Sequence, residues 1–195
     1  MSSKRKMRRR NLAAGQSLEI VYGPMHQSWH ARELLPGLHE LVESDPRAAV
    51  PELHALIERE PLPMLFNWLS AAYTALGDRE AVDVTIRENY RRNPQYLFAR
   101  VNYAELCIAS GDLDSAREAL GGTLEIRALL GARKRVHISE LRAYLYAVGL
   151  YHIEAGDVAA VEAACRTLER FDPDDPVVGV LKRGLRRRQV NRPAE

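Results

Sequence analysis

The stretch "AAYTALGDREAV", residues 71–82, contains an apolar helical run that stops at Gly77-Asp78 and begins again immediately. Glycine can adopt the left-handed backbone conformation that ends a helix without steric cost. The aspartate that follows it can cap the free amide groups of a second helix. The stretch therefore predicts a tight corner between two helices.

The same corner occurs twice more along the chain. "TALGDREAV" at 74–82 returns as "IASGDLDSA" at 108–116 and as "IEAGDVAAV" at 153–161. The first two turn glycines are 34 residues apart, and the third follows after a further 45, which is one period plus 11 inserted residues. A fixed period of this length is typical of helical-repeat proteins.

Residues at fixed offsets from each turn glycine share their chemical type. Seven positions before it the residue is small, as close contact between two helices requires, and three other offsets fall on one apolar stripe per helix. Pro94 and Pro173, each seventeen residues after a turn glycine, are expected to end the second helix of their pairs. The repeated positions are Ser70, Ala104 and Gly149; Leu69, Tyr103 and Val148; Val82, Ala116 and Val161; and Ile86, Leu120 and Cys165.

These corners, spacings and matched positions resemble the tetratricopeptide repeat (TPR) family over about residues 30–190. The resemblance implies an all-α, right-handed solenoid of helical hairpins at 19–190, between a disordered basic tail (1–18) and a C-terminal tail (191–195). Within it we expect a degenerate repeat at 30–61, repeats at 63–96, 97–122 and 142–175, an insertion at about 121–140 and a capping helix at 176–190.

Two features of the second repeat depart from the family pattern. Arg100 stands where the other repeats have Phe66 and Leu145, and Gly121-Gly122 breaks the second helix early. That helix is therefore expected to be short or irregular. In the insertion, Ser139 stands three residues before Arg142 and so makes no capping box, which leaves the fold of the segment undetermined.

In TPR proteins the first helices of the repeats line a concave groove, so the resemblance implies a module that binds a protein or peptide. Chaperone-binding members hold a carboxylate with a clamp of Lys, Asn and Arg, which this chain matches only at Asn102. We therefore expect an aromatic and amide-rich groove without that clamp. The alternative for its three aromatic residues is packing against a neighbouring repeat or the insertion. The expected groove residues are Asn67, Trp68, Thr74, Phe98, Asn102, Glu105 and Tyr146.

The charge distribution suggests an alternative function. Residues 1–10 carry six positive charges, and residues 181–195 carry six positive charges and one negative charge. Because the net charge of the whole chain is +2, residues 11–180 carry a net charge of −9. Two basic ends on an acidic body would suit an adaptor that associates with nucleic acid or ribonucleoprotein. Such binding would be non-specific, because no aromatic residues are interleaved with the basic residues of these segments. The simpler interpretation is a solvated tail and an exposed helix face. The basic residues are Lys4, Arg5, Lys6, Arg8, Arg9, Arg10, Lys182, Arg183, Arg186, Arg187 and Arg188.

Motifs for catalysis or metal binding are missing from the sequence. It has no GxSxG, phosphate loop or GxGxxG, and His26 and His30 lack a third ligand, so we expect no enzyme, metal or cofactor. Cys107 and His152, at equivalent points of neighbouring repeats, are better explained as core residues.

The sequence also bears on localisation. Two distant cysteines indicate a reducing compartment. The sequence contains no run of about 18 apolar residues, so we expect no membrane span. The basic N-terminus lacks the apolar middle of a signal peptide. We expect a cytoplasmic protein, with an organellar transit peptide as the minor alternative.

Overall fold

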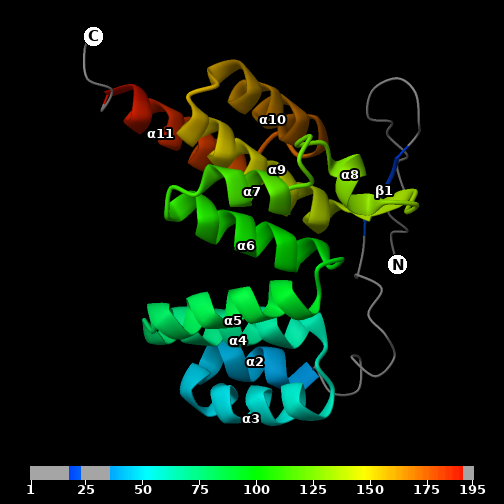
Figure 1. Ribbon diagram of the computed structural model, residues 1–195, viewed down its shortest axis with the longest axis vertical. Coiled ribbons are helices and arrows are strands. Elements are labelled where there is room, and N and C mark those ends of the chain that lie inside the picture. Colours follow the sequence, from blue (N-terminus) through cyan, green and yellow to red (C-terminus); the bar gives the residue numbers. More distant parts are fainter. Residues whose placement is uncertain (1–17, 23–35, 191–195) are drawn as a thin grey trace, which may run out of the picture.

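Paired helices joined by short corners make up most of the protein in the computed structural model, which describes residues 18–22 and 36–190 (Figure 1). No helix in these ranges combines the length and apolar character needed to cross a membrane. In the described residues the helices are α2 (Pro36–Ser44), α3 (Pro46–Arg59), α4 (Pro63–Leu76), α5 (Arg79–Arg92), α6 (Leu97–Ala109), α7 (Leu113–Ala119), α8 (Ile126–Leu130), α9 (Ile138–Ala155), α10 (Val158–Phe171) and α11 (Pro176–Val190). Two short strands, β1 (Glu19–Val21) and β2 (Arg135–His137), accompany them.

The three predicted Gly-Asp corners are confirmed. The turn glycines have φ angles of 76°, 81° and 79°, in the left-handed region where a side chain would be strained. The aspartate after each glycine accepts a hydrogen bond of 3.0 Å from the backbone amide three residues further on. These caps begin α5, α7 and α10, so each corner ends one helix and starts the next.

The predicted degenerate repeat also contains two helices. Asp45 accepts a hydrogen bond of 3.1 Å from the Ala48 amide, and Pro46 occupies the first position of α3. Residues 30–35 lie outside the described part of the chain. Further on, α5 and α10 end two residues before Pro94 and Pro173, as their positions predicted.

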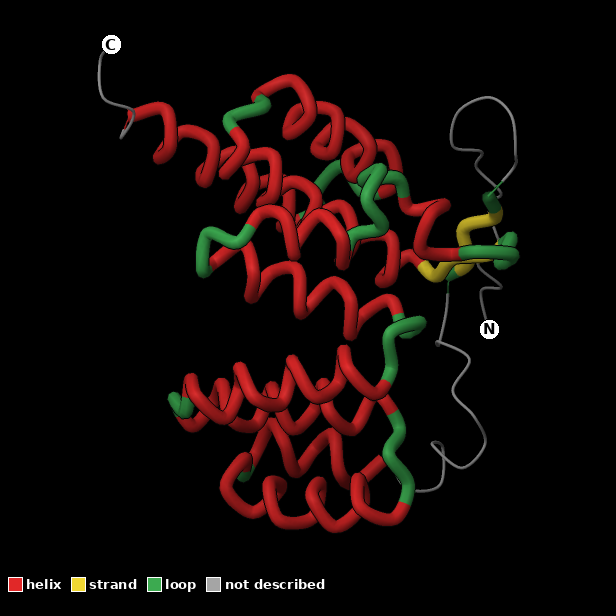
Figure 2. The backbone as a smooth tube through the Cα atoms, viewed as in Figure 1, coloured by secondary structure: helices red, strands yellow, loops and turns green. Residues whose placement is uncertain are grey.

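Successive helix pairs stack on one another (Figure 2). The helix α4 packs against α2, α3 and α5, while α6 packs against α5 and reaches α4. Above them, α9 packs on α6 and α7, and α11 closes the stack against α9 and α10. Where α5 meets α6, the rings of Tyr90 and Tyr103 stack with their centroids 4.4 Å apart.

The two departures in the second repeat compensate for each other. The helix α7 has only seven residues, as expected, and ends before Gly121 and Gly122, which both have positive φ. Its last carbonyl groups are satisfied by Arg100, which donates to the carbonyl oxygens of Ala119 at 2.7 Å and Glu118 at 3.1 Å. An arginine replaces an apolar residue here because the short helix exposes acceptors that need a donor.

The structure corrects the prediction for the insertion. Residues 121–140 contain α8 and β2, and β2 pairs in parallel with β1, so that Ile20 lies opposite Val136. A capping box is present, with His137 as the cap and Glu140 three residues later, so α9 starts at Ile138 and not at 142. The sequence test failed because histidine, and not Ser139, fills the capping position.

The N-terminal boundary also differs from the prediction. Leu18, placed at the end of a disordered tail, is 2% exposed and joins the core cluster around α6 and α9 together with Ile20. The amide of Glu19 donates to the carbonyl of Lys134 at 2.9 Å, which ties this segment to the insertion. Residues 1–17, 23–35 and 191–195 lie outside the described part, and so do the predictions made for them.

Candidate peptide-binding groove

A cavity of about 570 Å³ opens between α4, α5 and α6, beside the corner at Gly77, and we name it the amide groove. Its polar lining comes from Asn67, Ser70 and Thr74 on α4, Asp83 on α5, and Asn102 and Glu105 on α6. Its apolar walls include Val82, Ile86 and Leu106. Ser70 was expected at a tight contact between two helices, but it lines this cavity. Its small side chain therefore leaves space in the groove.

Four of the seven predicted groove residues meet in this cavity: Asn67, Thr74, Asn102 and Glu105. They come from two neighbouring predicted repeats, so positions counted from the turn glycines did identify side chains that share one space.

The predicted aromatic residues do not line the amide groove. Trp68 packs against the core of α2–α4, with its ring 5.7 Å from that of His39. Phe98 rests beside Tyr96, with centroids 5.7 Å apart, and Tyr146 packs against the cluster beneath α10 and α11. The sequence offered packing against a neighbouring repeat or the insertion as the alternative for these three residues, and Trp68 makes such a contact, since His39 belongs to the preceding predicted repeat. The groove is consequently lined by polar and aliphatic side chains.

A network of asparagines joins the helices that line the amide groove. Asn67 Oδ1 accepts hydrogen bonds from Asn89 Nδ2 at 3.0 Å and from Asn102 Nδ2 at 3.2 Å. Asn89 also donates to the carbonyl of Pro63 at 3.1 Å and accepts from Asn93 at 3.0 Å. The network joins α4, α5 and α6, so it fixes both the spacing of the helices and the orientation of the groove amides.

Sequence reasoning missed Asn89 and Asp83. Asn89 is 2% exposed, which is unusual for a polar residue and marks a structural hydrogen-bonding role. The available signal was its helical position: Asn89 lies three residues after Ile86, on the face of α5 expected to pack inward. Asp83 follows Val82, one of the repeated apolar positions, and no repeated offset selects it.

Glu105 is the most perturbed acid of the amide groove. The side chain is half-buried, and no hydrogen-bond or ion-pair partner contacts it among the described residues. Burial raises the pKa of its carboxyl group to about 7. Its charge, together with burial, raises the pKa of Tyr146, which places that predicted residue within electrostatic range of the groove.

We expect Glu105→Gln to stabilise the protein at alkaline pH. Because the folded-state pKa is raised, the stability contributed by protonation of Glu105 is fully present below pH 4.5 and is lost as the pH rises through about 7. At pH 8.5 the variant should gain about 1–2 kcal/mol in free energy of unfolding, after allowance for solvent screening. At pH 5 the gain should be small. Urea unfolding at both pH values measures the difference.

Glu58→Gln is the matched control for that measurement, because Glu58 is an exposed acid on α3. Its effect on the free energy of unfolding should be the same at both pH values. A Glu105→Gln effect that is equally independent of pH would show that burial does not disfavour the Glu105 carboxylate.

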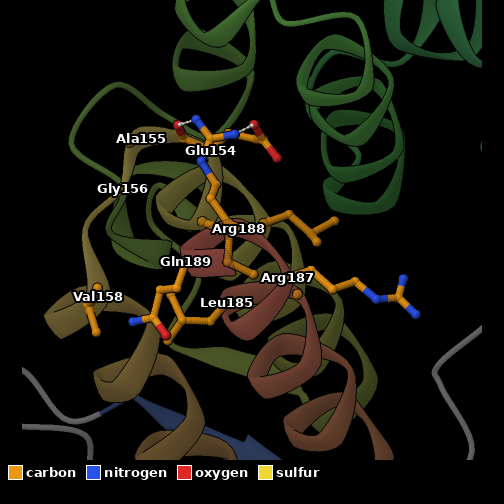
Figure 3. Close-up of a pocket in the computed structure, with 11 residues that line it drawn as sticks. Glu154, Ala155, Gly156, Val158, Leu185, Arg187, Arg188 and Gln189 are labelled. Atoms are coloured by element: carbon orange, nitrogen blue, oxygen red, sulfur yellow. Dashed lines mark hydrogen bonds and ion pairs between the residues drawn. The ribbon is translucent and has the colours of Figure 1, made fainter. Parts of the chain in front are cut away.

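A second cavity, of about 610 Å³, lies where the end of α11 meets the corner between α9 and α10 (Figure 3). Its walls are mainly aliphatic, with Leu150, Ile153, Val158 and Leu185. Arg188 at its rim is engaged by the Glu154 carboxylate and donates to the Glu154 carbonyl at 2.7 Å. Figure 3 shows Arg187 and Gln189 extending to opposite sides of α11. This cavity therefore offers few converging polar groups.

The C-terminal half of the predicted basic patch lies on the exposed surface of α11. Lys182 pairs with Glu169 at 2.8 Å, and Arg188 pairs with Glu154. Arg183, Arg186 and Arg187 are exposed. Two of the five predicted cations are thus used to attach α11 to α9 and α10. The N-terminal half, Lys4 to Arg10, lies outside the described residues.

The candidate metal and thiol groups are separate from the amide groove. Within residues 18–22 and 36–190, no three His, Cys, Asp or Glu side chains are grouped closely enough to hold a metal ion. Cys107 and Cys165 are buried, and burial raises the pKa of both thiols, which disfavours the reactive thiolate. His152 faces Asp157 at 3.6 Å, and burial lowers the pKa of its ring.

Comparison of the chain with protein-family models, with curated proteins and with solved structures found no match. The function of the protein is therefore inferred from the residues and the geometry described above.

Proposed function

We propose that this protein is a TPR-like helical-repeat module, without enzymatic activity, that binds a peptide or protein partner through the amide groove. One observation carries the proposal: four groove residues selected by their offsets from the turn glycines line a single open cavity. Two further observations support the repeat interpretation, namely the capped Gly-Asp corners and the stacking of successive helix pairs.

The chemistry of the amide groove suits an extended segment of polypeptide. Amide and hydroxyl groups in its lining can exchange hydrogen bonds with a peptide backbone, while the aliphatic side chains of the lining can contact the side chains of the peptide. The carboxylate clamp of chaperone-binding TPR proteins is incomplete, because only Asn102 matches it and Ala71 stands in the groove where another clamp residue would be. A free C-terminal carboxylate is therefore not the expected ligand.

Blocking the groove should abolish partner capture. Ala71 is exposed on α4 and lines the cavity, so Ala71→Trp fills the space without burying a bulky ring in the core. We expect the full-length variant to lose at least about tenfold in partner binding, which corresponds to about 1.4 kcal/mol. The measurement is quantitative pull-down from native lysate, with and without nuclease.

Two matched variants interpret that experiment. Ala163→Trp places the same ring on an exposed position of α10 and should leave capture unchanged. The second replaces the exposed Arg183, Arg186 and Arg187 of α11 with glutamine and tests the nucleic-acid alternative. Capture that survives Ala71→Trp but is lost with these arginines or with nuclease would contradict the proposed function.

A further inference from the structure

The amide groove is acidic. Its two charged lining residues are Asp83 on α5 and Glu105 on α6, and none of the described residues that line it is basic. Neither carboxylate has an ion-pair partner within the described part of the chain. Elsewhere acids are commonly paired, as Glu140 is with Arg133 at 2.8 Å and Asp175 with Arg142 at 2.7 Å. The groove thus holds uncompensated negative charge.

Acceptor oxygens lie beside these acids. Asn102 Nδ2 donates one of its two N–H groups to Asn67 Oδ1, and the Asn102 carbonyl oxygen remains available as an acceptor. Thr74 lines the groove and its hydroxyl donates to the Ser70 carbonyl, so toward a ligand this hydroxyl can act as an acceptor. Lysine and arginine side chains carry several donors and no acceptor, so they complement such a surface. An anionic group would meet repulsion from both carboxylates.

Burial makes a cationic partner more favourable still. The half-buried Glu105 carboxylate is poorly solvated, which is why its pKa is raised to about 7. A cation beside it would restore the lost stabilisation of the charged form. The aliphatic walls at Val82, Ile86 and Leu106 can contact the long carbon chain of lysine or arginine while the charged end reaches the acids.

We propose that the amide groove recognises a lysine or arginine side chain of the bound segment, with Glu105 and Asp83 receiving its charged end. The inference rests on the proposed peptide-binding function and specifies its ligand class, a basic segment of a protein partner. Glu105 and Asp83 determine specificity, while the asparagine network positions the helices that carry them.

The test is selection of binders from a random peptide library displayed on phage, with the full-length protein as the target. Selected peptides should share lysine or arginine at one position. The best of them, made with an acetylated N-terminus and an amidated C-terminus, should lose at least tenfold in affinity toward the double variant Glu105→Gln, Asp83→Asn. They should also lose affinity when their shared basic residue is replaced by glutamine.

A matched variant separates specific recognition from attraction to an acidic surface. Glu52→Gln with Glu58→Gln removes the same charge from exposed positions on α3 and should change affinity less than twofold. Equal losses in both double variants, or selected peptides without a shared basic residue, would overturn the inference.

The pH dependence of binding gives a further readout. Asp83 on α5 lines the same cavity as Glu105, Tyr146 on α9 is within electrostatic range of Glu105, and the groove residues of α4 are uncharged. Affinity for the basic peptide should rise between pH 6 and pH 8 in the wild type and stay flat in Glu105→Gln. A flat profile in the wild type would exclude Glu105 as the receiving group.

Failure of the inference and failure of the proposed function differ in outcome. Peptides that lose binding with Ala71→Trp but share no basic residue would place a ligand in the groove and overturn only the charge assignment. Absence of any selected peptide that is sensitive to Ala71→Trp would overturn both.

Discussion

The variant Gly149→Val should be strongly destabilised, with a loss of about 2–4 kcal/mol in the free energy of unfolding. Gly149 is buried in α9, and a Cβ atom at this position would lie 2.6 Å and 2.7 Å from the two terminal methyl carbons of Leu181. Leu181 is 0% exposed on α11, so it has little room to move. Urea unfolding monitored by circular dichroism gives the change.

Two companion variants identify the cause of that loss. Gly37 lies in α2, and a Cβ atom added there would have nothing within 4 Å, so Gly37→Ala should be neutral or stabilise by up to about 1 kcal/mol. Leu181→Ala removes the obstructing methyl groups, so the double variant with Gly149→Val should be more stable than the sum of the two single effects. Strict additivity would show that α11 does not restrict position 149.

The variant Asn89→Ala should cost about 2–3 kcal/mol in the free energy of unfolding. Its side chain is almost fully buried and makes three hydrogen bonds, to the Pro63 carbonyl, Asn67 and Asn93. Removal leaves these groups without their partner in a place that water reaches poorly. Because Asn67 also receives Asn102, the variant should in addition weaken ligand binding in the amide groove.

Asn93→Ala is the control for Asn89→Ala. Asn93 is half-buried, follows the end of α5 and contributes one bond to the same network, so its removal should cost less than about 1 kcal/mol. Denaturant unfolding of both variants compares them directly. Similar losses in the two variants would mean that the network stabilises the protein only through the bond between Asn93 and Asn89. The bonds of Asn89 to α4 would then contribute nothing to stability.

Local sequence chemistry was sufficient for the helix corners. Glycine followed by aspartate ends one helix and begins another through contacts within a few residues, so Gly77, Gly111 and Gly156 could be placed without any knowledge of the tertiary structure. The short α7 was likewise predictable from Gly121-Gly122. The capping box of α9 was missed because its first residue, His137, is not a common capping residue.

The candidate groove was only partly predictable. Offsets from the turn glycines identified Asn67, Thr74, Asn102 and Glu105, because helical periodicity fixes which side chains share a face. The same offsets also selected Trp68, which packs into the core of α2–α4. Periodicity gives the direction of a side chain from its own helix, but it does not reveal which neighbour already occupies that space.

By itself, the sequence determined the helical character of the chain, the corners and the order of the helix pairs, since all three depend on local backbone preferences and periodic burial. Only the tertiary structure decided three other features. It joined Ile20 to Val136 in a parallel strand pair across more than a hundred residues. It buried Asn89 between two helices, and it placed Glu105 and Asp83 in one cavity whose described lining includes no basic residue. Contacts between distant segments depend on the shape and charge of both partners, and no local pattern in the sequence encodes them.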